Sequence, residues 1–462
     1  MAQQAHGHAE HARPCGDPAV NVLRPAAADG RKAIVTMTIP NAPEALEAET
    51  KVVHGTWYAW YAVILLTGCY TLAFVDSKIP FILIEAIKAD LALTDTQLGI
   101  IAGPAFSLVY AIGALPIAKL SDRISRKYVI ATAVSVWSAF TAAGGATQSF
   151  LPFMLSRTGV ALGESALTPA AHSIFADLFP EARRPTAIAI YSCGIAMGFF
   201  LALSLGGILS DRLGWRSTLV IVGVVGFVLS LLVLTTLREP TRDLRPTGKQ
   251  ISRGSIVALF ADPAIRNTII GGTALGIANG SASAWSAAYV MRTFHLSASA
   301  TGATYGTLVG ILTIAGTLCG GLVAARLSSR DVRYGFRLLA VAFLVATIAK
   351  LCSLATSSYV LFLLFAALSG LLQMFYPGPT YATIQSLAKP DARSFASAVT
   401  MFCINAVGLA GGAFLTGWLS DQLKDYFGPE SLRYSLAILS LMSIWSAFHY
   451  WRASYHLGKR MR

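Results

Sequence analysis

Long apolar runs recur along this chain and set the limits on its fold. A helix needs about 20 apolar residues to cross the hydrocarbon core of a bilayer, and the sequence holds twelve runs of this kind. Only 13% of the 462 residues are charged, whereas soluble domains carry about 25%. The sequence therefore predicts an all-α, multi-pass membrane protein. The runs fall near 57–83, 96–120, 128–148, 151–175, 185–209, 217–236, 265–291, 300–325, 335–354, 359–385, 393–419 and 433–453.

The segment between the sixth and seventh runs is long, charged and contains proline, so it divides the runs into two groups of six. The first 56 residues are rich in Ala, His and Pro and hold no continuous apolar stretch, which excludes a cleaved signal peptide. We expect a disordered cytoplasmic tail at 1–56, an N-terminal six-helix half at 57–237, a cytoplasmic linker at 238–264, a C-terminal six-helix half at 265–453 and a short cytoplasmic tail at 454–462.

The distribution of Lys and Arg predicts the orientation of the chain. With both termini inside, and counting from Lys51 onwards, the inner segments carry 21 of these residues and the outer segments carry 6, as the positive-inside rule requires. The net charge of +13 therefore belongs to loops that orient helices. It is not the basic face of a nucleic-acid-binding domain, and we expect no nucleic-acid partner.

The two groups of runs repeat one another. Several segments match at an offset of 210 residues: "PEARRPTA" (180–187) with "PDARSFAS" (390–397), "GGILSDRL" (206–213) with "TGWLSDQL" (416–423), and Pro169 with Pro379. A finer repeat relates 118–127 to 320–330 at an offset near 203. Duplicated six-helix units are typical of transporters whose substrate site lies between two halves that rock. We expect alternating access on this basis.

The segment "GALPIAKLSDRISRK" resembles the loop signature of the major facilitator superfamily, with Ala118 and Ser125 where glycines are usual. In that superfamily the loop's Asp and Arg hold the halves together in the outward-open state. An ion pair present in only one conformer biases a two-state equilibrium. The alternative is a basic loop with an incidental acid, which does not explain why the Asp recurs. We expect a conformational gate formed by Asp122, Arg123, Arg126, Asp211 and Asp421.

Three ionisable residues fall inside apolar runs. Arg157 and Glu164, in "SRTGVALGESALTP", are seven positions apart, about 10 Å along one helix face. Asp76 lies in "TLAFVDSKIP". An intramembrane charge costs at least about 2.5 kcal/mol at the helix centre, so it normally faces a cavity and has a partner. Because the first and fourth helices are neighbours in the superfamily that the loop resembles, we expect one polar cluster.

This cluster has two interpretations. A carboxyl group gains proton affinity from burial and loses it beside an arginine, so Asp76 and Glu164 could exchange a proton as water access alternates. The alternative is a static ion pair that braces two helices. For Arg157, anchoring the acids and binding an anionic head group are equally consistent with the sequence.

Residues from about 57 to 453, most densely those at 74–216, resemble the spinster family of that superfamily, in a bacterial form. The resemblance rests on Asp76 ahead of a Pro-containing segment, on "LTDTQLG", and on Arg-x5-Gly-Glu at 157–164. Family members have Arg where this chain has Ser77, and a second Gly where it has Ala161. The resemblance implies a proton-coupled transporter of lysolipids, sphingoid lipids or similar amphiphiles, in a bacterial plasma membrane.

The C-terminal runs hold aromatic residues in place of an acid cluster. We expect Trp285, Tyr289, Phe375 and Tyr376 to be candidates for the cavity lining, although aromatics also simply fill membrane cores. "FYPGPT" (375–380) predicts a helix break. Lys78, Glu85, His172 and Lys350 are expected near helix ends, where long side chains reach the interface.

Two other functions remain open from the sequence. An exporter of small drugs or organic anions would use the same fold, with Arg157 binding the anion. An intramembrane lipid-modifying enzyme would need a nucleophile or His/Asp pair in a cavity, and the sequence offers none. We expect no enzyme activity, no cofactor and no metal site. The expected partners are an amphiphilic substrate, protons and the bilayer, and the chain is expected to act as a monomer.

Overall fold

A computed structural model describes residues 56–121, 124–239, 259–388 and 392–460 of the chain. Throughout these ranges the regular elements are helices. The predicted N-terminal tail and most of the predicted linker lie outside the described residues, as do two of the predicted gate residues, Asp122 and Arg123.

The N-terminal group of helices corresponds to the first six predicted runs. α3 with α4, and α6 with α7, each form one span with a break, and α8 contains two spans that meet at Gly214, whose φ is 79°. The elements are α2 (Thr56–Leu91), α3 (Asp95–Ala102), α4 (Pro104–Ser121), α5 (Arg126–Gly144), α6 (Phe150–Glu164), α7 (Leu167–Leu178) and α8 (Arg184–Thr236).

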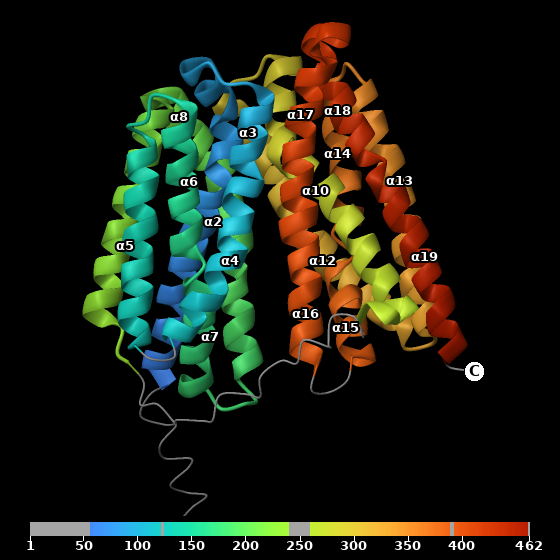
Figure 1. Ribbon diagram of the computed structural model, residues 1–462, viewed down its shortest axis with the longest axis horizontal. Coiled ribbons are helices and arrows are strands. Elements are labelled where there is room, and N and C mark those ends of the chain that lie inside the picture. Colours follow the sequence, from blue (N-terminus) through green and yellow to red (C-terminus); the bar gives the residue numbers. More distant parts are fainter. Residues whose placement is uncertain (1–55, 122–123, 240–258, 389–391, 461–462) are drawn as a thin grey trace, which may run out of the picture. The chain divides into compact units, whose positions relative to one another are not determined.

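The C-terminal group corresponds to the other six runs, and Figure 1 shows the two groups gathered on opposite sides. Its elements are α10 (Pro263–Phe294), α11 (Ala298–Thr301), η1 (Gly302–Gly306), α12 (Thr307–Ser328), α13 (Val332–Ala355), α14 (Tyr359–Gln373), α15 (Pro377–Leu387), α16 (Arg393–Phe402), η3 (Cys403–Leu409), α17 (Ala410–Phe427), η4 (Gly428–Glu430), α18 (Ser431–Ser440) and α19 (Met442–Arg460). In the described part, seven continuous helical stretches are long and apolar enough to cross a membrane, and the longest, Phe395–Gly458, covers the last two runs.

Each helix break has a local cause. α14 ends at Gln373 and α15 begins at Pro377, which confirms the break predicted from "FYPGPT", because proline lacks the backbone donor that a continuing helix needs. α3 and α4 meet at Gly103, where a Cβ atom would collide with the carbonyl oxygen of Ala410. The break therefore lets two helices approach closely.

The internal repeat is visible in the backbone. Ala92 and His295 have φ values of 50° and 52°, and they stand at equivalent places just after α2 and α10. Thr94 and Ser297 then cap the next helices with their side chains. Ala92 and His295 are 203 residues apart, and so are Thr94 and Ser297, which is the offset of the finer repeat in the sequence. The predicted fold class, an all-α protein of two pseudo-symmetric halves, is confirmed.

The halves pack against each other at one end, which we call the outer end because the Lys and Arg distribution predicts that it faces outwards; the opposite end is the inner end. Glycines bring the helices together there. A Cβ on Gly417 would collide with the carbonyl oxygen of Asp95, and one on Gly302 with that of Leu203. Such small-residue contacts are typical of helix packing in membranes.

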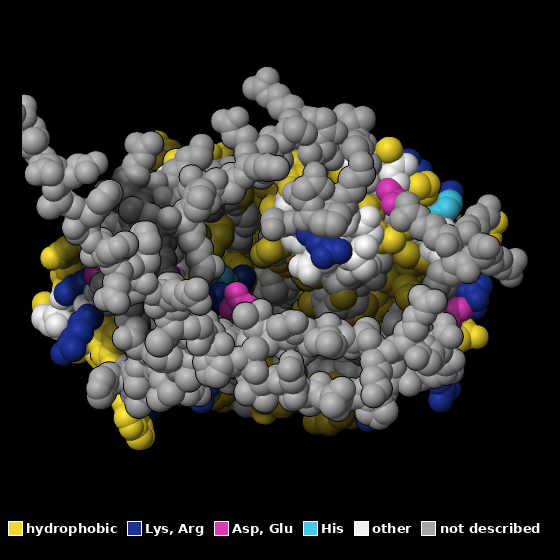
Figure 2. All heavy atoms as spheres, turned by 90° about the horizontal axis from the view of Figure 1, so that it is seen from below, with side chains coloured by type: hydrophobic (Ala, Val, Ile, Leu, Met, Phe, Trp, Pro, Cys, Tyr) yellow, Lys and Arg dark blue, Asp and Glu magenta, His cyan; other side chains and the backbone are white. Residues whose placement is uncertain are grey.

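The inner end presents a different surface. Figure 2 looks at this end: hydrophobic side chains show around its rim, and acidic and basic side chains lie next to each other near its centre. Exposed apolar side chains also cover much of the helix sides, among them Leu231, Leu318 and Ile348, each more than half exposed. The apolar rim and the apolar helix sides are both suited to contact with lipid.

Candidate functional site

The three ionisable residues predicted to form a cluster come from two helices of the N-terminal half. Asp76 lies in α2, and Arg157 and Glu164 lie in α6. Their exposed fractions are only 0%, 2% and 6%. The guanidinium Nη2 of Arg157 donates a hydrogen bond to the backbone carbonyl of Asp76 over 2.6 Å. Glu164 is the last residue of α6, at the break within the fourth span, and a membrane helix breaks only where protein or a cavity surrounds it.

Several polar atoms of the cluster form no hydrogen bond within the described part of the chain. Within the described part of the chain, both carboxylate oxygens of Asp76, Nη1 of Arg157 and Oε1 of Glu164 are buried without a hydrogen-bond partner. Thr141 and Trp137 of α5 lie close to the Asp76 carboxylate, yet their own polar atoms form no hydrogen bond within the described part. Buried charges are usually paired and fully hydrogen-bonded when they serve structure alone. This arrangement is not a saturated salt bridge.

Lys78 adds a second cation that the sequence placed elsewhere. Predicted to lie near a helix end, it stands well inside α2, because that helix continues to Leu91 instead of ending near residue 83. Its charge acts on Glu164, as do the charges of Arg157 and Asp76. The cluster therefore combines two acids with two bases, and the uncertain end of the apolar run explains why Lys78 was missed.

Aromatic side chains adjoin the same cluster. Tyr70 and Tyr191 stack with ring centroids 4.3 Å apart, and His172 packs edge-on against Tyr191 at 5.7 Å. The hydroxyls of Tyr191 and Thr168 are 3.1 Å apart. Tyr70 also lies within electrostatic reach of Glu164. This half thus offers flat apolar surfaces beside buried charge.

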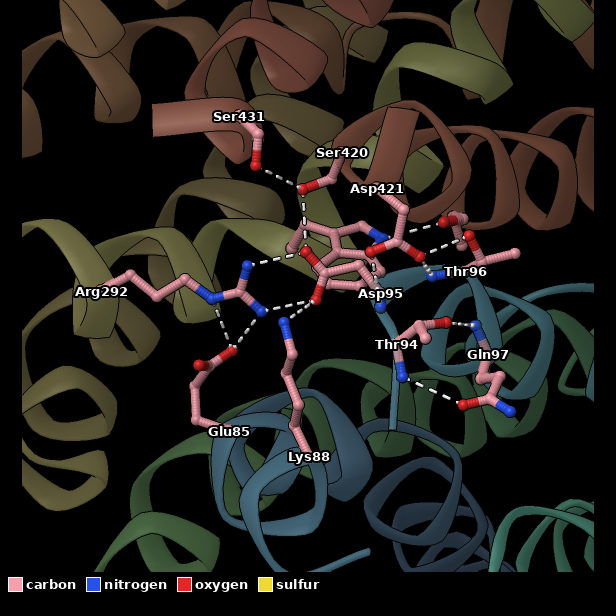
Figure 3. A network of polar contacts seen from close by, with 12 residues as sticks. Glu85, Lys88, Thr94, Asp95, Thr96, Gln97, Arg292, Ser420, Asp421 and Ser431 are labelled. Atoms are coloured by element: carbon pink, nitrogen blue, oxygen red, sulfur yellow. Dashed lines mark hydrogen bonds and ion pairs between the residues drawn. The ribbon is translucent and has the colours of Figure 1, made fainter. Parts of the chain in front are cut away.

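The outer end carries a second polar network, which joins the two halves (Figure 3). Asp95, at the start of α3, has a side chain only 4% exposed. The guanidinium of Arg292 on α10 donates two hydrogen bonds of 2.8 Å to its carboxylate and reaches Glu85 of α2 at 2.9 Å. Lys88 forms a further ion pair with Asp95. Bidentate pairs of this kind are among the strongest hydrogen bonds in proteins.

Two of the predicted gate residues contribute to the same end. Asp421 of α17 accepts hydrogen bonds from the backbone N–H groups of Asp95 and Thr96, at 3.2 and 2.7 Å. Asp211 of α8 accepts one from the N–H of Ser299, at 2.8 Å. Each carboxylate thus caps the N-terminus of a helix in the opposite half, where backbone donors and the helix dipole favour negative charge.

Arg126, the third predicted gate residue that the structure describes, lies at the inner end. Its guanidinium donates to Glu239 at 2.9 Å and to Ser173 at 2.8 Å, and pairs with Asp177. Burial raises the pKa of Glu239, but hydrogen bonds from the Lys127 N–H and from neighbouring groups outweigh this effect and lower the pKa below its usual 4.5. Ser173 and Asp177 belong to α7 of the N-terminal half, and Glu239 follows α8 at the start of the predicted linker.

The aromatic residues predicted as possible cavity lining occupy different surroundings. Trp285 and Tyr289 are 0% and 1% exposed within the apolar core. The Trp285 indole donates to the Ala413 carbonyl at 2.8 Å and the Tyr289 hydroxyl to the Leu354 carbonyl at 3.4 Å, so both serve packing in this conformer. Phe375 and Tyr376 are partly buried at the break between α14 and α15, and for them a place on the cavity wall stays a prediction.

Lys350 was predicted to lie near a helix end, and the structure corrects this. Its side chain is buried, 5% exposed, and its ammonium donates to the Ser286 hydroxyl at 3.1 Å. Among the described residues no carboxylate lies within ion-pair distance of it. The described residues also contain no group of His, Cys, Asp and Glu that could hold a metal ion.

Comparisons with known proteins bear on this arrangement. Residues 66–413 match the family model of the Major Facilitator Superfamily. An MFS-type efflux pump of Mycolicibacterium smegmatis is 36% identical over 87% of this chain and 94% of its own. A sphingosine-1-phosphate transporter of Danio rerio is 24% identical over 68% of this chain and 66% of its own.

A solved structure is also similar over most of the chain. It is a bacterial homologue of the human lysosomal transporter Spinster, in an inward-facing and unoccupied conformation. It is 26% identical, with a TM-score of 0.78, and the match covers 87% of this chain and 98% of that one. The resemblance to spinster proteins noted in the sequence is therefore confirmed. This chain belongs to the major facilitator superfamily, as a multi-pass membrane transporter and not an enzyme.

Proposed function

We propose that this protein is a proton-coupled secondary transporter of a lipid-like amphiphile, such as a lysolipid or a sphingoid lipid, and that it works by alternating access. In this proposal it acts as a monomer in a bacterial inner membrane, with both termini in the cytoplasm. The observation that carries the proposal is the buried cluster of Asp76, Arg157 and Glu164, whose polar atoms are largely unpaired in the described part.

The chemistry of the cluster suits proton exchange. Burial favours the protonated form of a carboxyl group, whereas a nearby cation favours the carboxylate. Both conditions meet at Glu164, which lies among Asp76, Arg157 and Lys78. A small change in water access or in the distance to Arg157 then decides whether a proton is held. A saturated salt bridge would lack this sensitivity.

The surroundings of the cluster suit a substrate with a polar head and an apolar tail. Charged groups from α2 and α6 lie beside the stacked rings of Tyr70 and Tyr191. A head group can approach Arg157, which has an unused donor, while a chain lies along aromatic surface. The sphingosine-1-phosphate transporter among the relatives supports a lipid substrate.

The network at the outer end supports alternating access. It joins the halves through Asp95, Arg292 and Asp421, so opening that end requires these contacts to break. At the inner end Arg126 hydrogen-bonds to Ser173, Asp177 and Glu239, which lie in or just after the N-terminal half. We assign Asp95 and Arg292, together with Asp211 and Asp421, to an outer gate. Arg126, with Asp122 and Arg123, belongs in this proposal to an inner gate.

The proposal is tested by uptake into proteoliposomes that contain the full-length protein. Lysophosphatidylcholine and sphingosine are supplied with and without an imposed pH gradient, to wild type and to Glu164→Gln. We expect gradient-driven accumulation by wild type and at least a tenfold loss in the variant, because a carboxamide cannot release a proton. Exchange of lipid at equal pH should persist in the variant, which shows that its fold and binding site survive.

A matched control is Glu181→Gln, which removes a carboxylate that is 87% exposed in a loop and should leave uptake unchanged. If gradient-driven uptake survives in both Glu164→Gln and Asp76→Asn, proton coupling through this cluster is wrong. If wild type transports neither lipid, the lipid part of the proposal is wrong.

A second candidate is export of small drugs or organic anions. The efflux pump that is 36% identical over most of the chain favours it. In this case Arg157 binds the anion, and everted vesicles should accumulate a small organic anion but no lysolipid. Arg157→Gln would then abolish anion transport more severely than Glu164→Gln does.

A further inference from the structure

A groove runs along the lipid-facing side of the C-terminal half, apart from the polar cluster and both gates. It holds about 260 Å³ and is lined mainly by apolar side chains from α10, η3 and α19, including Ile270, Val407, Met442 and Trp445. Val407 and Trp445 are 49% and 53% exposed. η3 is a π-helical segment, and such segments are rare and often lie at functional sites. Because this face lies in the membrane-spanning part, its neighbours are acyl chains.

Two arginines stand at the inner end of this groove. Arg266 lies one turn before Ile270 on α10, and its guanidinium reaches the carbonyl of Phe260, another lining residue, at 3.5 Å. Arg452 lies two turns beyond Trp445 on α19, with its guanidinium 5.6 Å from the Phe448 ring. Both side chains are exposed. Within the described residues, neither guanidinium forms an ion pair.

A polar pair lies between the arginines and the apolar part of the groove. Nδ1 of His449 is 2.8 Å from the side-chain oxygen of Asn267. His449 is 8% exposed, and its Nε2 is a buried atom without a hydrogen-bond partner in the described part. His449 lies one turn from Trp445 along α19, with ring centroids 5.1 Å apart. His449 and Asn267 are buried behind the groove and do not line it, but the side chains beside the groove change from apolar to polar to cationic towards the inner end.

We propose that this groove binds an anionic phospholipid of the inner leaflet. One acyl chain lies in the apolar part, and Arg266 and Arg452 hold the phosphate of the head group. The charge of the site identifies the occupant, because basic pockets between membrane helices at the cytoplasmic side attract anionic head groups. Asp262 lies one turn before Arg266 and accepts from the Ala264 N–H; Arg266, Arg452 and Asp262 together carry a net charge of +1 among the described residues.

The bound lipid contacts α10, η3 and α19 together, and η3 packs against α10 through glycines. A Cβ on Gly276 would lie 2.6 Å from the Ile404 carbonyl oxygen. A lipid in this position stabilises that contact. The site is separate from the substrate cluster, so it does not depend on the proposed function.

The test is native mass spectrometry of the purified full-length protein, titrated separately with phosphatidylglycerol and phosphatidylcholine. We expect wild type to retain phosphatidylglycerol with at least tenfold higher affinity than phosphatidylcholine. The double variant Arg266→Gln, Arg452→Gln should lose most of this difference. The control Arg183→Gln, which removes an exposed arginine in the other half, should keep it.

A second variant tests the apolar part independently of the charges. Val407→Trp places a large side chain in the groove from its lipid-facing side, and we expect it to weaken binding of phosphatidylglycerol about tenfold while the thermal unfolding temperature without added lipid stays near that of wild type. Equal affinity of wild type for both lipids would overturn the proposal. So would binding that is unchanged in both the double variant and Val407→Trp, or binding that Arg183→Gln reduces as strongly as the double variant does.

Discussion

At the scale of single residues, the buried charges differ in how well their surroundings satisfy them. Asp95 accepts hydrogen bonds from Arg292 and Ser420 and pairs with Lys88. Asp76 has no side-chain hydrogen bond within the described part. A satisfied charge stabilises one arrangement of helices, whereas an unsatisfied one is costly in that arrangement, and intramembrane charges of this kind commonly mark functional sites. This contrast supports the different roles that we propose for the outer network and for the cluster of Asp76, Arg157 and Glu164.

Lys350 gives a prediction about stability at this scale. Its ammonium is buried against the Ser286 hydroxyl without a carboxylate nearby in the described part. Replacing a buried charge by an apolar side chain of similar length often stabilises a protein. We expect Lys350→Met to raise the free energy of unfolding by on the order of 1 kcal/mol, measured as a higher thermal unfolding temperature in detergent. A lower unfolding temperature would show that the ammonium makes net stabilising contacts.

The ionisable residues in the middle of apolar runs could be recognised from the sequence, whereas those near the ends of the runs could not be placed correctly. Asp76, Arg157 and Glu164 stand out because their neighbours are apolar. Lys78 and Lys350 were placed at helix ends, and the helices in fact extend beyond them. Asp95 lies just outside a predicted run, and its partner Arg292 is 197 residues away, so no local pattern could join them.

At the scale of elements, helix ends carry much of the polar structure. Asp211 and Asp421 cap helices of the opposite half, while Glu239 accepts from the Lys127 N–H near the start of α5. The sequence repeat did predict that the two aspartates are equivalent. It could not predict which backbone they contact, because that depends on how the halves approach each other.

Glu239 gives a prediction about pH. Its pKa is lowered in the folded protein from the usual 4.5, so between the two pKa values the unfolded state binds more protons and stability rises with pH. The stabilisation is present above about 4.5 and is lost as the pH falls through the lower, folded pKa. We expect Glu239→Gln to lower the thermal unfolding temperature at pH 7 and to reduce the fall in that temperature between pH 5 and pH 3, relative to wild type.

The control for this experiment is Glu181→Gln, whose carboxylate is far more exposed. An equal pH dependence in wild type and in Glu239→Gln would contradict the assignment of a lowered pKa to this group. Circular dichroism at the α-helical band follows unfolding in each case.

At the scale of the whole molecule, the contacts at the outer end stabilise one conformer. Removing one partner of a buried ion pair typically costs about 3–5 kcal/mol, because the other charge is left buried. Arg292→Gln leaves Asp95 with Lys88 and a serine. We expect this variant to favour opening of the outer end, because opening hydrates Asp95.

Spin labels on the two halves measure this change. Leu213 and Tyr426 are exposed at the outer end, on α8 and α17. Cysteines introduced there report the distance between the halves once the native cysteines other than the buried Cys69 are replaced. We expect the labelled Arg292→Gln variant to show a population with a longer distance between the two labels than the labelled wild type shows. Distances that do not change would exclude Arg292 from the gate.

The fold was more predictable than the conformation. Run length predicted the helices and the repeats predicted two related halves, whereas the orientation derived from the charge asymmetry stays a prediction. The positive φ values at Ala92 and His295 follow the same offset. Which end of the halves is in contact could not be predicted, because glycines such as Gly417 and Gly302 are common in every membrane helix.

The most direct test of the account is whether substrate moves protons. Proteoliposomes holding a pH-sensitive dye receive a gradient of lysolipid or sphingosine at equal pH on both sides. If the carboxylates of the buried cluster couple the two fluxes, wild type should change the internal pH as lipid moves, and Glu164→Gln should transport lipid without that change. Lipid transport by wild type with a constant internal pH would contradict the central claim.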